Sequence, residues 1–264
     1  RFESLAKAIA KIDSPHTVPV LEYGEVEGQA VIVREGIEGQ SLTNLVTGGN
    51  GLQLDIALDI ARQLGEYVEA IHLAGVFQVV FDPQEILLSS DSVVRVTDLG
   101  MAQGLNIGEM LAEGKAKAQP YHAPELLRGE KTDPRTDFYS LGVLLFKILT
   151  GKELDAKAVA SDQSLIAGRL PSRQRLGIPP EWDELVAKCL HPNPAKRIQS
   201  AAEFMNRVTE VQRGMAEGAQ ATMIGMEDSL MGQTLGAYRL VERLGQGGMA
   251  TVYKGYEAAL DRYV

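Results

Sequence analysis

Residues 137–149 read Asp-Phe-Tyr-Ser-Leu-Gly-Val-Leu-Leu-Phe-Lys-Ile-Leu. Apolar side chains fall on nearly every side of a 3.6-residue period, which predicts a helix that is buried almost all round. The run is too short to cross a bilayer, and Lys147 interrupts it. A helix of this kind belongs at the centre of a sizeable domain.

The segments around this helix predict a domain of helices and short strands. The stretch 52–73 carries an apolar stripe at helical spacing, and Ser200 is placed to cap a helix over 201–211. A further helix is expected over 182–190. Short strands are expected over 30–34, 85–88 and 93–96.

Composition excludes several classes of protein. The chain has 264 residues, of which 45% are hydrophobic and 23% charged, as in globular proteins. Its formal net charge of −9 argues against an electrostatic binder of nucleic acid or of anionic membranes. Cys189 is the only cysteine, which excludes an internal disulfide framework and a cysteine-rich zinc site. No signal peptide or membrane segment is recognised, so we expect a cytoplasmic location.

Both ends of the sequence look like cuts through longer elements. Apolar residues within 1–12 already run at helical spacing, and 236–264 contains two strands, a glycine-rich turn and the start of a third strand. Between them, 214–235 is rich in Gly, Ala, Met, Gln and Ser without periodicity, which predicts a flexible linker. We therefore interpret the chain as a domain over 1–213, a linker over 214–235 and the beginning of a second domain over 236–264.

Four short motifs occur in a fixed order: Asp98-Leu99-Gly100, Ala123-Pro124-Glu125, Asp137 to Gly142, and Pro194-Ala195-Lys196-Arg197. Together they resemble a protein kinase, and most of all the bacterial eukaryotic-like serine/threonine kinases. The resemblance covers residues 1 to about 213. It implies an α+β, protein-kinase-like fold with a mainly helical large lobe and an incomplete small-lobe β-sheet. It also implies structural roles in which Arg197 pairs with Glu125 and Asp137 caps backbone amides of the catalytic loop.

The tail carries a second resemblance. Residues 244–254 read Leu-Gly-Gln-Gly-Gly-Met-Ala-Thr-Val-Tyr-Lys, similar to the loop that covers the nucleotide phosphates in the same family. Ala250 stands where the general pattern has its third glycine. The resemblance implies a second kinase domain in the parent protein, which would use ATP and Mg²⁺. The implied cofactor-binding residues are Leu244, Gly245, Gly247, Gly248 and Val252.

The first domain departs from the family where phosphoryl transfer needs its charges. The family loop has the pattern His-Arg-Asp-x-Lys-Pro-x-Asn, which aligned on Pro83 corresponds to Gln-Val-Val-Phe-Asp-Pro-Gln-Glu here. Val80 occupies the position of the base and Asp82 that of the lysine, so no catalytic residue is assigned. Loss of the base alone costs about 10²–10⁴ in rate. At ~5 Å and an effective dielectric of about 20, reversing the lysine's charge costs roughly 3 kcal/mol per unit charge.

Other positions point the same way. Leu5 replaces the glutamate that pairs with the ATP-anchoring lysine, Arg34 stands at the entrance of the adenine pocket, and Ala118 replaces a substrate-gripping threonine. The segment 101–120 has no hydroxyl to phosphorylate, and Val79 replaces its phosphate-binding arginine. These departures resemble a pseudokinase. A residual metal site of Asp98 and Glu85 is one interpretation of the loop, and a turn capped by Asp98 is the alternative.

Three functional hypotheses follow. In the first, 1–213 is a catalytically dead regulatory module of a tandem serine/threonine kinase, the parent of which phosphorylates proteins. In the second, the domain is a nucleotide-free interaction scaffold. In the third, it is a kinase with a rebuilt active site that uses Asp82 or Glu85. The expected partners are a protein substrate or a regulatory protein, including contact with the tail's kinase domain, for example by pairing of its strands with an open edge near 30–34.

Overall fold

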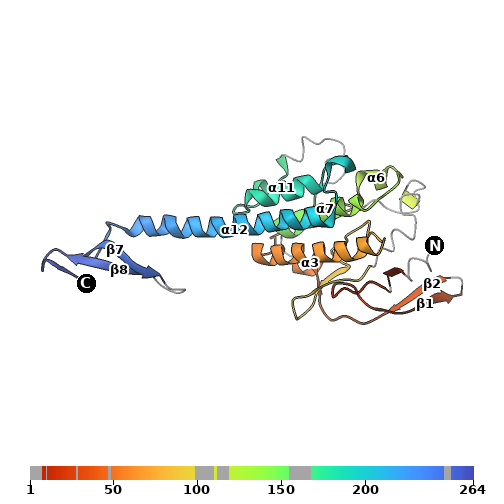
Figure 1. Ribbon diagram of the computed structural model, residues 1–264, viewed down its shortest axis with the longest axis horizontal. Coiled ribbons are helices and arrows are strands. Elements are labelled where there is room, and N and C mark those ends of the chain that lie inside the picture. Colours follow the sequence, from red (N-terminus) through yellow and green to blue (C-terminus); the bar gives the residue numbers. More distant parts are fainter. Residues whose placement is uncertain are drawn as a thin grey trace. The chain divides into compact units, whose positions relative to one another are not determined.

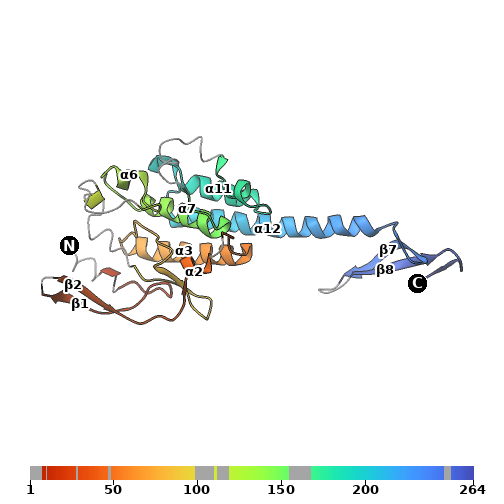
Figure 2. The same ribbon diagram turned by 180° about the vertical axis from the view of Figure 1, so that it is seen from behind.

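The structure is a computed structural model that describes residues 8–9, 11–27, 29–46, 49–98, 110–111, 119–154, 168–246 and 251–264. The chain divides into two compact units, Arg1–Gln212 and Arg213–Val264. Figures 1 and 2 show the elements of each unit from opposite sides.

Helix α7 (Arg135–Thr150) is the centre of the first unit, as the apolar run predicted. Nearly all of its side chains are buried, including Phe138, Leu141 and Leu145. It begins after Pro134, and it ends at Gly151, whose φ of 73° places it in the left-handed region that favours glycine. Helix α7 is therefore the central element of the unit's hydrophobic core.

Helix α7 packs against α3 (Leu54–Leu73), α11 (Pro180–Cys189) and the first half of α12 (Ala201–Leu230). The Phe138 and Phe204 rings stack with their centroids 6.1 Å apart, which joins α7 to α12. Ser200 caps α12 as predicted, because the Glu203 amide donates to its Oγ at 3.1 Å. The core thus joins segments that are far apart in the sequence.

Two small antiparallel sheets belong to the same unit. Strands β1 (Val20–Val26) and β2 (Gln29–Arg34) form one, with Val26 opposite Gln29 at the turn. Strands β3 (Gln40–Ser41), β4 (Ile86–Leu88) and β5 (Val94–Val96) form the other. The described residues of the unit also form short helical turns: α2 (Leu42–Leu45), α6 (Pro124–Leu127), α10 (Pro171–Gln174) and η1 (Pro194–Lys196).

The second unit contains a four-stranded antiparallel sheet in the order β6-β7-β8-β9. Its strands are β6 (Thr234–Leu235), β7 (Tyr238–Gln246), β8 (Thr251–Glu257) and β9 (Arg262–Tyr263). The strands predicted within 236–264 are therefore present, and they pair with one another. Leu244 and Val252 are both more than half exposed.

The expectation of a flexible linker over 214–235 is wrong for most of that segment, because α12 continues to Leu230. The segment lacks apolar periodicity, but its Ala, Met, Gln and Glu residues have high helix propensity. Adding residues to a helix that is already nucleated is much easier than starting one.

Several predicted features lie outside the described residues. They are most of the helix expected within 1–12, including Leu5; Leu99 and Gly100 of the first motif; residues 101–109 and 112–118, including Ala118; and the tip of the glycine-rich turn at Gly247, Gly248 and Ala250.

Candidate functional site

The loop after α3 is held in place by one carboxylate of the central helix. Asp137 is completely buried and accepts hydrogen bonds from the backbone amides of Gln78 at 2.9 Å and Val79 at 2.6 Å. Its Oδ2 also lies 2.8 Å from Nε2 of His72, in the last turn of α3. These are the catalytic-loop amides that the family resemblance assigned to Asp137.

Val79 adopts an unusual backbone conformation with φ at 71°. The left-handed region is strained for a β-branched residue, and such strain persists only where the surroundings enforce it. Here the amide of Val79 is bonded to Asp137, and its side chain is 1% exposed. The bonds to Asp137 therefore hold the loop backbone in one defined conformation at Val79.

Val80 and Phe81 follow Val79 in the loop, and both side chains are buried. Val80 is 8% exposed, and the amide of Phe81 donates to the Ser140 hydroxyl of α7 at 2.7 Å. A valine side chain has no atom that accepts a proton. Val80 is therefore a buried side chain of the loop that cannot accept a proton.

Asp82 has a local structural contact. Its Oδ1 accepts the amide of Gln84 at 2.9 Å, and its backbone carbonyl accepts the amide of Glu85 at 3.0 Å. This is the arrangement in which an aspartate closes a turn with its own side chain. The carboxylate therefore shapes the bend that leads into β4.

Glu85 and Asp98 come from two segments that lie against each other. The Thr97 hydroxyl donates to Glu85 Oε2 at 2.5 Å and the Thr97 amide donates to the Glu85 carbonyl at 2.8 Å. The Gln78 side-chain amide donates to the carbonyl of Asp98, and its oxygen accepts the Tyr67 hydroxyl at 2.7 Å. Gln78 therefore ties α3, the loop and the segment after β5 together.

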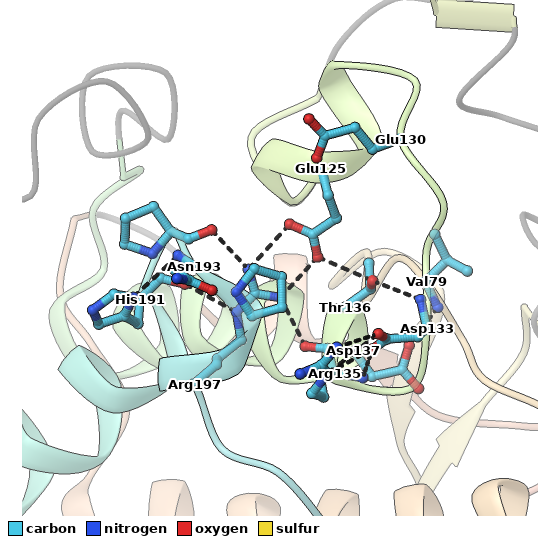
Figure 3. Close-up of polar contacts among 12 residues, drawn as sticks. Val79, Glu125, Glu130, Asp133, Arg135, Thr136, Asp137, His191, Asn193 and Arg197 are labelled. Carbon is cyan, nitrogen blue, oxygen red and sulfur yellow. Dashed lines mark hydrogen bonds and ion pairs between the residues drawn. The ribbon is translucent and has the colours of Figure 1, made fainter.

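A buried ion pair lies beside this loop (Figure 3). Arg197 donates to both carboxylate oxygens of Glu125, at 2.8 Å and 3.1 Å, and the two residues are 0% and 3% exposed. Arg197 also donates to the carbonyls of Arg135 and His191, and the Thr136 hydroxyl donates to Glu125. Fork-to-fork geometry with the remaining donors satisfied is what a buried ion pair requires.

Comparison with known proteins agrees with this arrangement. The family model described as the protein kinase domain matches residues 5–208. The chain belongs to the protein kinase family. Its α+β architecture is accordingly that of a protein kinase domain.

The relatives of this kinase-family chain include bacterial enzymes. PknB of Mycolicibacterium smegmatis, a serine/threonine-protein kinase, is 30% identical over 242 residues, which are 88% of this chain and 39% of the relative. PknD of Mycobacterium tuberculosis, also a serine/threonine-protein kinase, is 31% identical over 212 residues, 77% of this chain and 32% of the relative. A probable serine/threonine-protein kinase of Clostridium perfringens is 28% identical over 218 residues, 81% of this chain and 32% of the relative. The chain resembles the bacterial eukaryotic-like branch and spans about a third of the length of these relatives.

Typical members of the kinase family use ATP and Mg²⁺ and act on proteins. In the described part of this member, no group of three or more His, Cys, Asp or Glu side chains could hold a metal ion. Glu85 already accepts the Thr97 hydroxyl, and the Asp82 carboxylate already accepts the Gln84 amide. With these local partners the two carboxylates fit the binding of Mg-ATP poorly.

The glycine-rich turn of this kinase-family chain belongs to the second unit. Gly245 lies opposite Val252 in the β7–β8 ladder, and Leu244 falls at an irregularity in the register.

None of the described helices is long and apolar enough to cross a membrane.

Some contacts of the loop were not foreseen from the sequence. The ring of His72, in the last turn of α3, bonds Asp137 in the central helix, a contact that helical spacing does not predict. Gln78, Thr97 and Ser140 were not singled out, although each fastens one side of the loop. A polar residue beside an apolar run was the available signal, but the sequence does not say which segment such a residue meets.

Proposed function

We propose that residues 1–213 form a non-catalytic regulatory domain, a pseudokinase, within a bacterial serine/threonine kinase protein. The observation that carries the proposal is Val80, a packed valine at the position where the family has its general base. Without an acceptor at this position no side chain takes the proton of the substrate hydroxyl, and the transfer step is slowed.

The contacts of the neighbouring carboxylates support the same function. Asp82 closes a turn through Gln84, and Glu85 accepts the Thr97 hydroxyl. A rebuilt active site would need one of these carboxylates to face the reactants. Their local partners favour a structural role for both.

The retained polar contacts support a role in protein recognition. The Glu125–Arg197 pair and the amides bonded to Asp137 keep the shape of a kinase domain. We propose that this domain acts in the cytoplasm through contact with a protein, a kinase domain of the same parent being the first candidate. Residues 236–264 would begin that kinase domain, with 244–252 covering the phosphates of its ATP. Phosphorylation of protein Ser/Thr by the parent belongs to the same proposal.

A phosphotransfer assay tests the lost chemistry. The chain is incubated with γ-labelled ATP, Mg²⁺ and a Ser/Thr peptide library, beside the double variant Val80→Asp, Asp82→Lys. We expect no labelled peptide from the unsubstituted chain. Labelling by that chain, and its loss in the double variant, would instead establish a rebuilt active site and overturn the proposal.

A thermal-shift titration with ATP, with and without Mg²⁺, separates a nucleotide-sensing regulator from a nucleotide-free scaffold. A ligand that binds only the folded state raises the melting temperature. The scaffold is favoured by the bond between Thr97 and Glu85 and by the exposed Arg34 at the adenine entrance. A Mg²⁺-dependent rise that disappears in Asp98→Asn would exclude the scaffold. Asp91→Asn is the matched control, because Asp91 is an exposed turn carboxylate.

A further inference from the structure

The stretch around the short helix α10 is basic throughout. Residues 168–177 include three arginines and no acidic residue, and α10 packs against both α7 and α11. The Nζ of Lys152, just after α7, lies 3.3 Å from both the carbonyl oxygen and Oε1 of Gln174, which brings a fourth cation to this stretch. We call the four cations the basic patch: Lys152, Arg169, Arg173 and Arg175.

Two carboxylates beside the basic patch are engaged with other groups. Glu153 pairs with Lys147 at 2.6 Å, and Asp183 accepts the Ser172 amide at 2.9 Å and also the Ser172 hydroxyl. In the part of the chain that the structure describes, none of the four cations forms an ion pair with a carboxylate. On a chain with a net charge of −9, this cluster is a local reversal of sign that attracts an anionic partner.

The arginines of the basic patch differ in what they contact. Nη1 of Arg175 donates to the carbonyl oxygens of Leu52 at 2.6 Å and Leu149 at 2.9 Å, so this guanidinium is held by the fold. Arg173 is exposed and Arg169 partly exposed, and neither guanidinium has a hydrogen-bond partner among the described residues. Arg169 and Arg173 therefore have donors that can bind a ligand.

The make-up of the basic patch favours a phosphate group over a row of carboxylates. Most of its cations are arginines, whose planar forks donate to two oxygens of one phosphate at once. All lie close to a single residue, Gln174, whose Nε2 donates to the Gly168 carbonyl at 3.3 Å. A phosphorylated serine or threonine carries a charge of about −1.5 to −2 on one group, which matches a compact cluster of cations.

Leu176 lies directly after the last arginine of the basic patch and is 95% exposed. Burial of this side chain against an apolar side chain of a partner is favourable, which a free phosphate ion does not offer. We propose that the basic patch and Leu176 bind a phosphorylated Ser/Thr segment of a partner protein. The inference rests on the proposed function, because it names the chemistry of the protein that the regulatory domain contacts. The kinase activity proposed for the parent would produce such segments.

Fluorescence polarisation of the full chain with labelled peptides tests this inference. The probe is a short peptide with one phosphoserine, a neighbouring leucine and no other charged side chain, and the same peptide with serine is its control. We expect the phosphopeptide to bind at least about tenfold more tightly, because the control lacks the charge-assisted hydrogen bonds. Its affinity should fall between about 50 mM and about 300 mM NaCl, since salt screens exposed charges. Equal binding of the two peptides, or binding of neither, would overturn the inference.

Variants of the chain locate the binding site. The double variant Arg169→Ala, Arg173→Ala should weaken phosphopeptide binding at least about tenfold, and Leu176→Ser should weaken it further in the same background. Arg128→Ala is the matched control, since Arg128 is an exposed arginine of the same unit that pairs with Glu130, and it should leave binding unchanged. Circular dichroism spectra show that each variant is folded. A double variant that binds as tightly as the unsubstituted chain would contradict the assignment.

Two competitors distinguish the phosphorylated segment from other anions. Inorganic phosphate and a peptide with glutamate in place of the phosphoserine should each displace the probe much less effectively than unlabelled phosphopeptide. Displacement by either as effective as that by the phosphopeptide would show a general anion-binding surface and would reject the inference. The phosphotransfer assay does not depend on the basic patch, so a failure of this inference is distinguishable from a failure of the proposed function.

Discussion

At the residue level, the pair of Glu125 and Arg197 illustrates how a polar contact is tolerated inside an apolar domain. Burying two charges is costly, and the attraction between them offsets that cost only when the other donors and acceptors are satisfied. Here the guanidinium also reaches the carbonyls of Arg135 and His191, and its carbon lies 5.2 Å from the centre of the Tyr139 ring. If either residue is removed, the other remains as a buried charge without its partner, which lowers the stability of the domain.

Removing one member should therefore be severe. We expect Arg197→Ala to lower the free energy of unfolding by about 3–5 kcal/mol, because it leaves the Glu125 charge buried and unpaired. Arg128→Ala breaks an exposed pair with Glu130 and should cost about 0–1 kcal/mol. Urea denaturation of both variants measures the difference. Equal losses would show that the buried pair adds nothing to stability.

Single residues also show which contacts could be predicted from the sequence and which could not. The pairing of Arg197 with Glu125 was expected because both belong to motifs with a shared structural role. The bond between Gln78 and Asp98 was not expected, because it depends on how two loops approach each other. Local patterns identify residue types and spacings, whereas cross-chain contacts of polar side chains depend on the assembled fold.

At the element level, the approach of α7 and α11 depends on one missing side chain. A β-carbon on Gly142 would lie 2.6 Å from Cβ of Cys189, closer than such atoms can come. Both helices are buried where they meet, so neither has room to move away. The glycine of the Asp137–Gly142 motif thus sets the distance between the two helices.

We expect Gly142→Ala to destabilise the domain by about 1–3 kcal/mol through overpacking. The matched control is Gly218→Ala in α12, where an added β-carbon meets nothing within 4 Å. Alanine has the higher helix propensity, by about 1 kcal/mol, so the control should not lose helix. Thermal unfolding followed by circular dichroism compares the two. A Gly142→Ala variant as stable as the unsubstituted chain would contradict the close packing.

Elements with strong periodicity were predicted well, and the others were not. The central helix was predicted over 137–149 and spans Arg135–Thr150. Strand β1 was missed, although Glu27-Gly28 between Val20–Val26 and Gln29–Arg34 has the length of a tight hairpin turn. Its glutamates and Gly24 hide the alternation that reveals a strand. Because the second half of α12 also lacks periodicity, that segment was predicted to be a linker and not a helix.

For the whole molecule, buried titratable groups limit stability at both ends of the pH scale. Burial lowers the pKa of His122 from 6.5 to about 4. Between these values the unfolded chain binds a proton that the folded chain does not, so stability falls as pH decreases from about 6.5 to about 4. At about 1.4 kcal/mol per pKa unit, the loss reaches up to about 3 kcal/mol.

The variant His122→Asn isolates this contribution. It keeps an acceptor for the Gln119 amide, which donates to His122 Nδ1 at 3.2 Å, but it does not titrate. Melting temperatures at about pH 7 and about pH 4.5, inside the window set by the shifted pKa, give the acid loss for each protein. We expect a smaller loss in the variant. Identical losses would mean that carboxylates alone account for the acid limb.

At alkaline pH it is the folded chain that keeps protons which the unfolded chain loses. Burial raises the pKa of the Cys189 thiol well above its usual 9.0, and burial likewise raises the pKa of Tyr67 and Tyr139 above 10.0. Above about pH 9 the unfolded thiol ionises while the folded thiol stays neutral, so stability falls as pH rises, by up to about 1.4 kcal/mol per unit. Because the tyrosines ionise at higher pH in the unfolded chain, the interval from about pH 8 to about pH 9.5 reports mainly on Cys189.

We expect Cys189→Ala to have a lower melting temperature at about pH 8, since it loses buried volume. Between about pH 8 and about pH 9.5, however, its melting temperature should fall by less than that of the unsubstituted chain. Parallel pH curves for the two proteins would instead place the alkaline limit on other groups.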